Sequence, residues 1–156
     1  MPQQKRVWIL VADAARARFF ASGGEVDGIR AVDDSELENT DLLRHTRDAG
    51  SDRPGRSYES VGGARHAQEP RIDLHRQEKE RFARKIADFI ATSARSDRFD
   101  ELILVAPPQL LGELRDALDQ QAASRVMREV AKDLMKLPAR QLAAQLRSLV
   151  RPERRL

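Results

Sequence analysis

The sequence predicts a single α/β domain with a mixed sheet of five strands and flanking helices. Two short apolar runs, Arg6–Ala12 and Glu101–Ala106, are typical of strands buried on both faces. Segments with helical periodicity lie between and after these runs. The chain has 156 residues, a length typical of one domain. Because such strands are joined by helices, the helices are expected to pack on the faces of the sheet.

The N-terminal part predicts a meander of three strands. Arg6–Ala12 is followed by a half-alternating segment, Arg16–Ala21, and Gly23-Gly24 then marks a turn. A third, weaker strand is predicted at Ile29–Val32. Its acidic surroundings are typical of an exposed edge strand.

The C-terminal part predicts three helices and a further strand. The helices are predicted at residues 75–94, 109–119 and 138–150, each with an apolar stripe. Residues 124–137 fit either a helix or a last strand. The first and fourth strands are the most apolar, so we expect them to be central neighbours. This order of elements is the plan of ribonuclease-H-like mixed sheets.

A long segment between these parts, residues 44–73, carries glycines and arginines and lacks an apolar period. A loop of this length inside a compact domain is uncommon and is either functional or disordered. We therefore expect one domain over residues 1–150, interrupted by this loop, and a flexible basic tail at 151–156.

Composition excludes several classes of protein. The chain has no cysteine, which rules out disulfides, thiolate catalysis and zinc sites built on cysteine. The N-terminus does not resemble a signal peptide and no apolar run could span a membrane. We therefore expect a cytoplasmic protein with no membrane partner, no metal and no cofactor. The oligomeric state stays open.

The net charge of +3 hides an uneven distribution. Residues 25–41 hold seven acids and one base, whereas residues 125–156 hold nine bases and three acids. A basic end of this kind can bind RNA by releasing counterions. A solvated helix face and a frayed tail are the simpler explanation of the same pattern.

Few residues have the setting of a catalytic group. Asp13 ends the first strand, where ribonuclease-H nucleases place a metal ligand. No second acid ends the fourth strand to share a metal ion with it. We therefore expect Asp13 to hydrogen-bond to the hairpin backbone. His66 is a weak candidate for a general base. Gly62-Gly63 predicts a tight bend that could bring the backbone close to a ligand, and Tyr58 could stack on a base.

Several motifs resemble the bacterial host-attachment protein family. The resemblance lies in Trp8–Arg18, Gly62–Pro70, Glu78–Ala83, Leu104–Gly112 and Glu129–Leu134, in that order. It implies that residues 125–131 form a strand. It also implies similarity to the middle domain of archaeal and eukaryotic class 1 release factors, which presents a Gly-Gly-Gln loop to the ribosome. Here Ala64 follows Gly62-Gly63 and the glutamine is absent.

These observations favour a non-catalytic binding module over an enzyme. We expect it to engage ribosomal RNA, transfer RNA or a ribonucleoprotein through residues 54–71 and the basic C-terminal third. The candidate contact residues are Arg56, Tyr58, Gly62, Gly63, Arg65, His66 and Arg71. A hydrolase of an ester such as peptidyl-tRNA, and a protein adaptor in surface or host attachment, are the alternatives.

Overall fold

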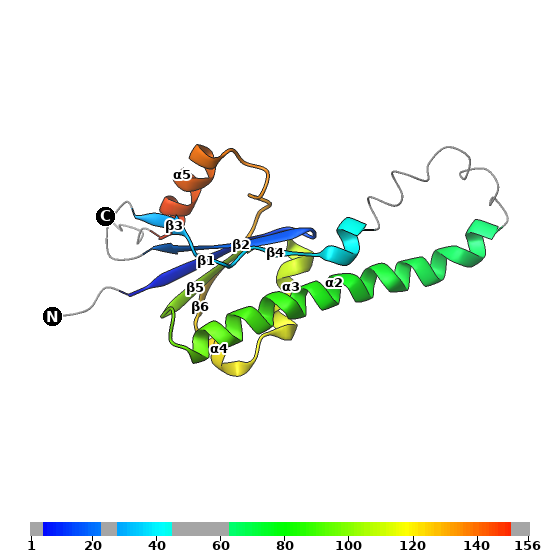
Figure 1. Cartoon of the computed structure of the whole chain (residues 1–156), viewed down its shortest axis with the longest axis horizontal. Coiled ribbons are helices and arrows are strands. Elements are labelled where there is room, and N and C mark those ends of the chain that lie inside the picture. Colours follow the sequence, from blue (N-terminus) through cyan, green and yellow to red (C-terminus); the bar gives the residue numbers. More distant parts are fainter. Residues whose placement is uncertain (1–4, 23–27, 45–62, 151–156) are drawn as a thin grey trace.

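The computed structural model describes residues 5–22, 28–44 and 63–150, with the helical backbone alone for 63–73 and 75. It is a mixed sheet with helices on both faces (Figure 1). The strands are β1 (Val7–Ala12), β2 (Arg16–Ser22), β3 (Ile29–Ala31), β4 (Leu37–Glu38), β5 (Glu101–Ala106) and β6 (Val126–Ala131). The helices are α2 (Gly63–Arg95), α3 (Pro108–Ala117), α4 (Gln120–Ser124) and α5 (Ala139–Val150), and residues 40–44 are also helical.

The sheet has the order β3-β2-β1-β5-β6, with β4 pairing with β2 beyond the end of β3. β1 pairs antiparallel with β2 and parallel with β5, and β5 pairs parallel with β6. The expectation that the first and fourth predicted strands are central neighbours is therefore confirmed.

Alternate residues of β1 serve two separate cores. Trp8, Leu10 and Ala12 face the α2 and α3 side, whereas Val7, Ile9 and Val11 face the α5 side. All six are buried, which explains why the strand is continuously apolar instead of alternating. The cores are completed by apolar stripes on the helices, which include Phe82, Ile86, Ile90, Leu110 and Leu114 on one face and Leu142 and Leu146 on the other.

One feature of the sheet differs from the sequence prediction. β4 is a sixth strand, and its two residues are too few to produce a periodic signal. Residues 126–131, which fitted helix or strand by periodicity, form β6, as the family resemblance implied. β6 is an edge strand with a register shift opposite Leu102 and Ile103, and Met127 is 50% exposed there. Because β6 is exposed and its register shifts, buried apolar and exposed polar residues do not alternate along it as they do in a regular strand.

Helix α2 begins at Gly63, although the sequence predicted irregular chain as far as residue 73. The helical start was missed because residues 63–74 lack an apolar stripe and contain Pro70, a helix breaker in most interiors. Asp73 therefore lies inside the helix, not before it. In Figure 1 the N-terminal half of α2 extends past the sheet, and we call residues 63–79 the arm.

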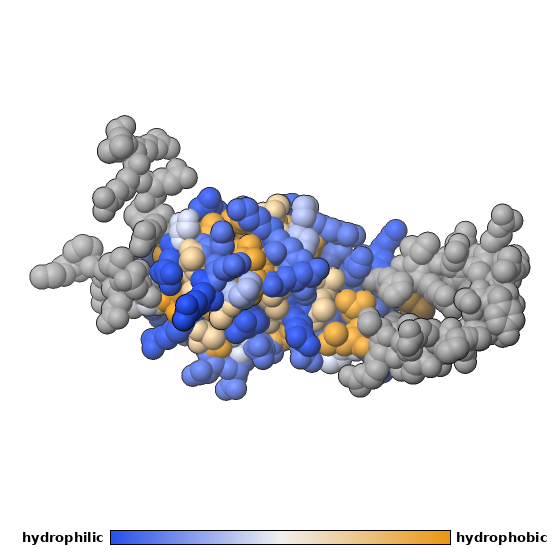
Figure 2. Space-filling view, turned by 90° about the horizontal axis from the view of Figure 1, so that it is seen from above, coloured by the Kyte–Doolittle hydropathy of each residue, from blue (hydrophilic) through white to orange (hydrophobic). Residues whose placement is uncertain are grey.

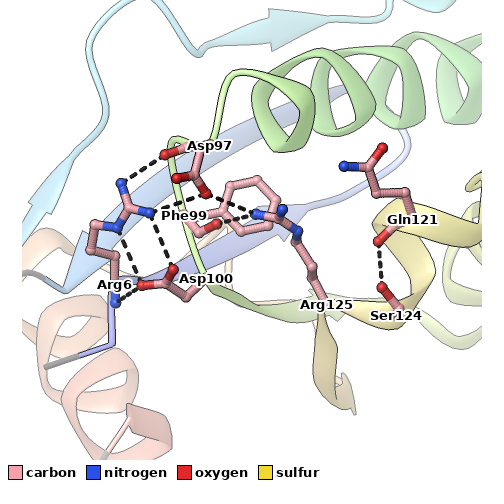
Figure 3. Close-up of polar contacts among 7 residues, drawn as sticks. All are labelled: Arg6, Asp97, Phe99, Asp100, Gln121, Ser124 and Arg125. Atoms are coloured by element: carbon pink, nitrogen blue, oxygen red, sulfur yellow. Dashed lines mark hydrogen bonds and ion pairs between the residues drawn. The ribbon is translucent and has the colours of Figure 1, made fainter. Parts of the chain in front are cut away.

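The other end of α2 is fixed to the sheet by a charged cluster (Figure 3). The Arg6 guanidinium donates hydrogen bonds to the Asp97 carbonyl at 2.7 Å and to both carboxylate oxygens of Asp100. The guanidinium and the backbone N–H of Arg6 lower the pKa of Asp100 from 3.8 to about 2. Arg125 also pairs with Asp97, at 3.6 Å. These contacts hold the turn between α2 and β5.

From the α5 side the surface is mostly hydrophilic, with apolar residues in separate areas (Figure 2). Leu74 and Met127 are the large apolar side chains exposed among the described residues. Within the described ranges, none of the helices is both long and apolar enough for a membrane span.

Candidate functional site

The turn after β1 uses the carboxylate of Asp13 for its own structure. Asp13 Oδ1 accepts hydrogen bonds from the backbone N–H groups of Ala15 and Arg16, each at 2.8 Å. The N–H of Asp13 donates in turn to the Arg16 carbonyl at 2.9 Å. The hydrogen-bonding role expected for Asp13 is confirmed. In the part of the chain that the structure describes, no three histidine or acidic side chains are grouped to hold a metal ion.

A small cleft lies beside this turn, between α2 and α3. The carboxyl ends of β1 and β5 meet here because the two strands are parallel neighbours, and ligands of open α/β sheets commonly bind at such an edge. The cleft has a volume of about 70 Å³, enough for a few water molecules or one polar group. Its lining residues are Ala14, Lys79, Phe82, Pro107, Gln109, Leu110 and Glu113.

Charged groups of opposite sign line this cleft. Burial raises the pKa of the Glu113 carboxyl above its ordinary value of 4.5, while the charge of Lys79 acts to lower it and that of Glu80 to raise it. Phe82 supplies an apolar wall and Gln109 an amide. The polar side chains of the cleft can therefore donate hydrogen bonds to a ligand group and accept hydrogen bonds from it, while that group packs against the ring of Phe82.

The segment after β3 anchors α2 where the arm leaves the domain. Asn39, 4% exposed, donates to the Ala14 carbonyl at 3.1 Å and accepts from the N–H of Leu42 at 3.1 Å. Arg81 on α2 pairs with Asp41 at 3.5 Å. On α2, Glu78 is 3% exposed, whereas Leu74 is 47% exposed. The domain body therefore ends near Glu78.

Four of the seven predicted contact residues lie on the arm. Gly63 opens α2, and Arg65, His66 and Arg71 follow within its first turns. The expectation of a glycine bend at this point is not met by Gly63, which begins a helix. The remaining three residues, Arg56, Tyr58 and Gly62, lie outside the described residues. The prediction that these seven contact RNA stays a prediction.

The helical register of the arm separates charges that nearly cancel along the sequence. Arg71, His75 and Lys79 follow one another at i, i+4 spacing and share one side of α2, which we call the basic row. Glu69 and Asp73 precede Arg71 and His75 by two residues. Since each residue turns the helix by about 100°, a two-residue step of about 200° places these acids on the other side. Glu78, seven residues after Arg71, lies on the side of the basic row, where it is buried at 3% exposure. The basic row ends at Lys79, in the cleft.

Sequence reasoning missed the cleft residues Lys79, Gln109 and Glu113. Lys79 and Glu113 belong to helical segments whose charges are typical of solvated faces. A usable signal was present: the first and fourth strands were expected to be neighbours, so the residues that follow their carboxyl ends had to meet. Pro107-Pro108 starts α3 at that edge and thereby positions Gln109 and Glu113.

A family model for a protein required for attachment to host cells matches residues 8–146. The chain belongs to this family. The match covers all the strands except the first residue of β1, as well as the cleft and the arm. No curated protein sequence matches this chain.

Among solved structures, the host-attachment chain is similar to the crystal structure of the archaeal translation termination factor aRF1. The identity is 10% and the TM-score is 0.40. The superposition covers 92% of this chain and 38% of the termination factor, so the chain spans well under half of that protein.

Proposed function

We propose that this host-attachment family member is a non-catalytic RNA-binding module whose arm contacts the phosphates of ribosomal or transfer RNA. The observation that carries the proposal is the basic row on α2. Its members, Arg71, His75 and Lys79, share one side of a helix that extends past the domain body (Figure 1). A cationic helix face is able to neutralise several phosphates of one strand and release their counterions.

The spacing of the basic row suits a repeating anion. An i, i+4 step advances about 6 Å along a helix, so Arg71 and Lys79 are about 12 Å apart along the axis of α2. A polyanion lying along this side meets two permanent cations with His75 between them. A compact anion could reach only one of the two. The geometry therefore favours a polymer such as RNA over a single phosphate group.

The cleft supports a second, shorter-range contact at the end of the row. Gln109 and Glu113 offer hydrogen-bonding groups beside Lys79. Hydroxyl groups and base edges are the parts of RNA that such groups recognise. We therefore assign the phosphates to the arm and one sugar or base edge to the cleft. Arg56 and Tyr58, which lie outside the described residues, remain proposed contacts of the same RNA.

The basic C-terminal third is not part of this surface. Its cations include Arg128 and Lys132, which lie on and just after the edge strand β6, and Arg140 on α5. α5 packs on the face of the sheet opposite α2 (Figure 1). One RNA strand on the arm would have to pass around the domain to reach them. The proposal therefore narrows the expected interface to the α2 side.

A binding titration with matched variants tests the proposal. Filter binding of tRNA and cosedimentation with ribosomes are measured for the wild type, for Arg71→Ala with Lys79→Ala, and for Arg128→Ala with Lys132→Ala. Both variants remove one arginine and one lysine. We expect the arm variant to bind about tenfold or more weakly, because two charge-assisted contacts are lost, and the control to change less than about threefold. Equal weakening of both variants would contradict the assignment to the arm.

Hydrolysis of an ester such as peptidyl-tRNA is the second candidate, and Glu113 is the observation that favours it. A carboxyl whose pKa is raised by burial in a cleft is suited to general-base chemistry. Turnover of a charged tRNA that is lost in Glu113→Gln and kept in the exposed control Asp88→Asn would establish this function. A protein partner that resists nuclease and high salt would instead support an adaptor.

A further inference from the structure

An open hollow lies at the opposite end of α2 from the arm, on the same face of the sheet. It has a volume of about 810 Å³ and is formed by the ends of β1, β2 and β3 and the turn before β5. Three arginines, Arg6, Arg30 and Arg98, line it. Its volume is within the range of sites for small organic ligands. The hollow shares no residue with the cleft.

The register of the sheet explains why the hollow exists. Trp8 is opposite Ala21 in the β1–β2 pair, and Ala21 is opposite Arg30 in the β2–β3 pair. Directly opposed residues project from the same face, so these three form one row across the sheet. The small side chain of Ala21 lies between two large residues and forms the bottom, or floor, of the hollow. Since neighbouring strands are about 4.8 Å apart, the Cα atoms of Trp8 and Arg30 are about 10 Å apart.

Two of the three arginines are available to a ligand. Arg6 is engaged by Asp97 and Asp100 through hydrogen bonds and ion pairs (Figure 3). Arg98 and Arg30 are exposed, and within residues 5–22, 28–44 and 63–150 no ion pair engages either guanidinium. Arg98 instead covers the ring of Trp8, with its Cζ 4.9 Å from the ring centroid.

The acidic groups of the hollow leave a positive balance for a ligand. Asp97 is held by Arg6 at 3.3 Å and by Arg125 at 3.6 Å, so its charge is already compensated. Among the described residues of the lining, Asp33 is the other acid. Within those residues, two guanidinium groups without an ion pair therefore face one exposed carboxylate. The planar guanidinium fork matches the oxygens of a phosphate group, which it binds through paired hydrogen bonds.

We propose that this hollow binds the phosphate group of a phosphorylated ligand, held between Arg30 and Arg98 above Ala21. The inference is independent of RNA binding by the arm. The ligand draws Arg98 away from the indole or changes its distance from the ring, so the environment of Trp8 reports binding. Trp8 is the single tryptophan of the chain, which makes its fluorescence specific to this site.

The test is a titration of the full chain with sodium pyrophosphate, followed by the emission of Trp8 and by calorimetry. Sodium sulfate and sodium chloride at equal ionic strength are the reference titrations. We expect a saturable response to pyrophosphate alone, and weakening of about tenfold or more in Arg30→Ala, because one charge-assisted pair of hydrogen bonds is lost. Arg147→Ala, on the other face of the sheet, is the control and is expected to bind normally.

Ala21→Leu provides a second variant that removes no charge. The larger side chain occupies the floor and is expected to abolish the pyrophosphate response. A circular dichroism spectrum and melting temperature close to those of the wild type show that the fold is kept. If Arg30→Ala and Ala21→Leu both respond as the wild type does, or if sulfate and chloride reproduce the response, the proposal is wrong.

One further titration, with a 5′-phosphorylated oligoribonucleotide, separates the sources of the phosphate group. A response to pyrophosphate without one to a 5′-phosphorylated oligoribonucleotide assigns the hollow to small phosphorylated molecules, and a response to both assigns it to the end of a nucleic acid. The Arg71→Ala, Lys79→Ala variant is expected to keep the pyrophosphate response. A failure of the proposed RNA binding by the arm can therefore be distinguished from a failure of the proposed phosphate binding by the hollow.

Discussion

Pro70 lies inside the arm, and replacing it tests whether the arm is a helix in solution. It is the eighth residue of α2, beyond the first turn, whose N–H groups lack partners in any helix. Proline at this point removes the hydrogen bond to the carbonyl of His66 and crowds that carbonyl, at a cost of about 3 kcal/mol relative to alanine. Pro70→Ala should therefore stabilise the helical arm by about 3 kcal/mol, a factor of roughly 100 in its opening equilibrium.

Hydrogen exchange of the amides of residues 67–69, which lie beyond the first turn, measures this opening. We expect protection to increase about a hundredfold in Pro70→Ala, with little change in the free energy of global unfolding, because the arm extends beyond the domain body. Gln77→Ala is the control and should change protection only slightly. Exchange of these amides at the rate of an unstructured chain in both proteins would refute the helical arm and, with it, the separation of charges into rows.

Three further predictions concern stability. The pKa of Asp100 is lowered to about 2, so its ion pair with Arg6 stabilises the fold above pH 4 and this contribution is lost as pH falls from about 4 to 2; Asp100→Asn should flatten the acid limb of the unfolding curve. Ile90→Ala should cost about 2–5 kcal/mol in urea unfolding because Ile90 is fully buried, whereas the exposed Asp88→Ala should stay within about 0.5 kcal/mol. Asp13→Ala should cost about 1–3 kcal/mol through two lost hydrogen bonds to the turn backbone, and an unchanged melting temperature would contradict this role.

The sheet was predictable because its signals are local. The apolar runs of β1 and β5 are buried on both faces, and such runs stand out in any sequence. The stripe of α2 from Phe82 to Ile90 was equally clear, since it packs on the sheet. β4 was not predicted because a strand of two residues is too short to show an alternation of apolar and polar residues. It exists through pairing with Arg16 and Ala17, which are distant in sequence.

The candidate site was less predictable because it depends on neighbours in space. Residues 63–73 were predicted as part of a loop because no apolar stripe marks their helical turns. Along the sequence Arg71 is offset by Glu69 and Asp73, and only a helical backbone places them on different sides. The hollow near Trp8 depends on a row across three strands, so Arg30 could not be linked to Trp8 before the register was known.

The salt dependence of tRNA binding tests the basic row most directly. The logarithm of the association constant should fall linearly with the logarithm of salt concentration for the wild type, and each lost phosphate contact should reduce the slope by about 0.7–0.9. We therefore expect the Arg71→Ala, Lys79→Ala variant to have a slope smaller by about 1.5 and the Arg128→Ala, Lys132→Ala variant to keep the wild-type slope. A wild-type affinity that does not depend on salt, or a slope unchanged in the arm variant, would contradict the assignment of RNA phosphates to the arm.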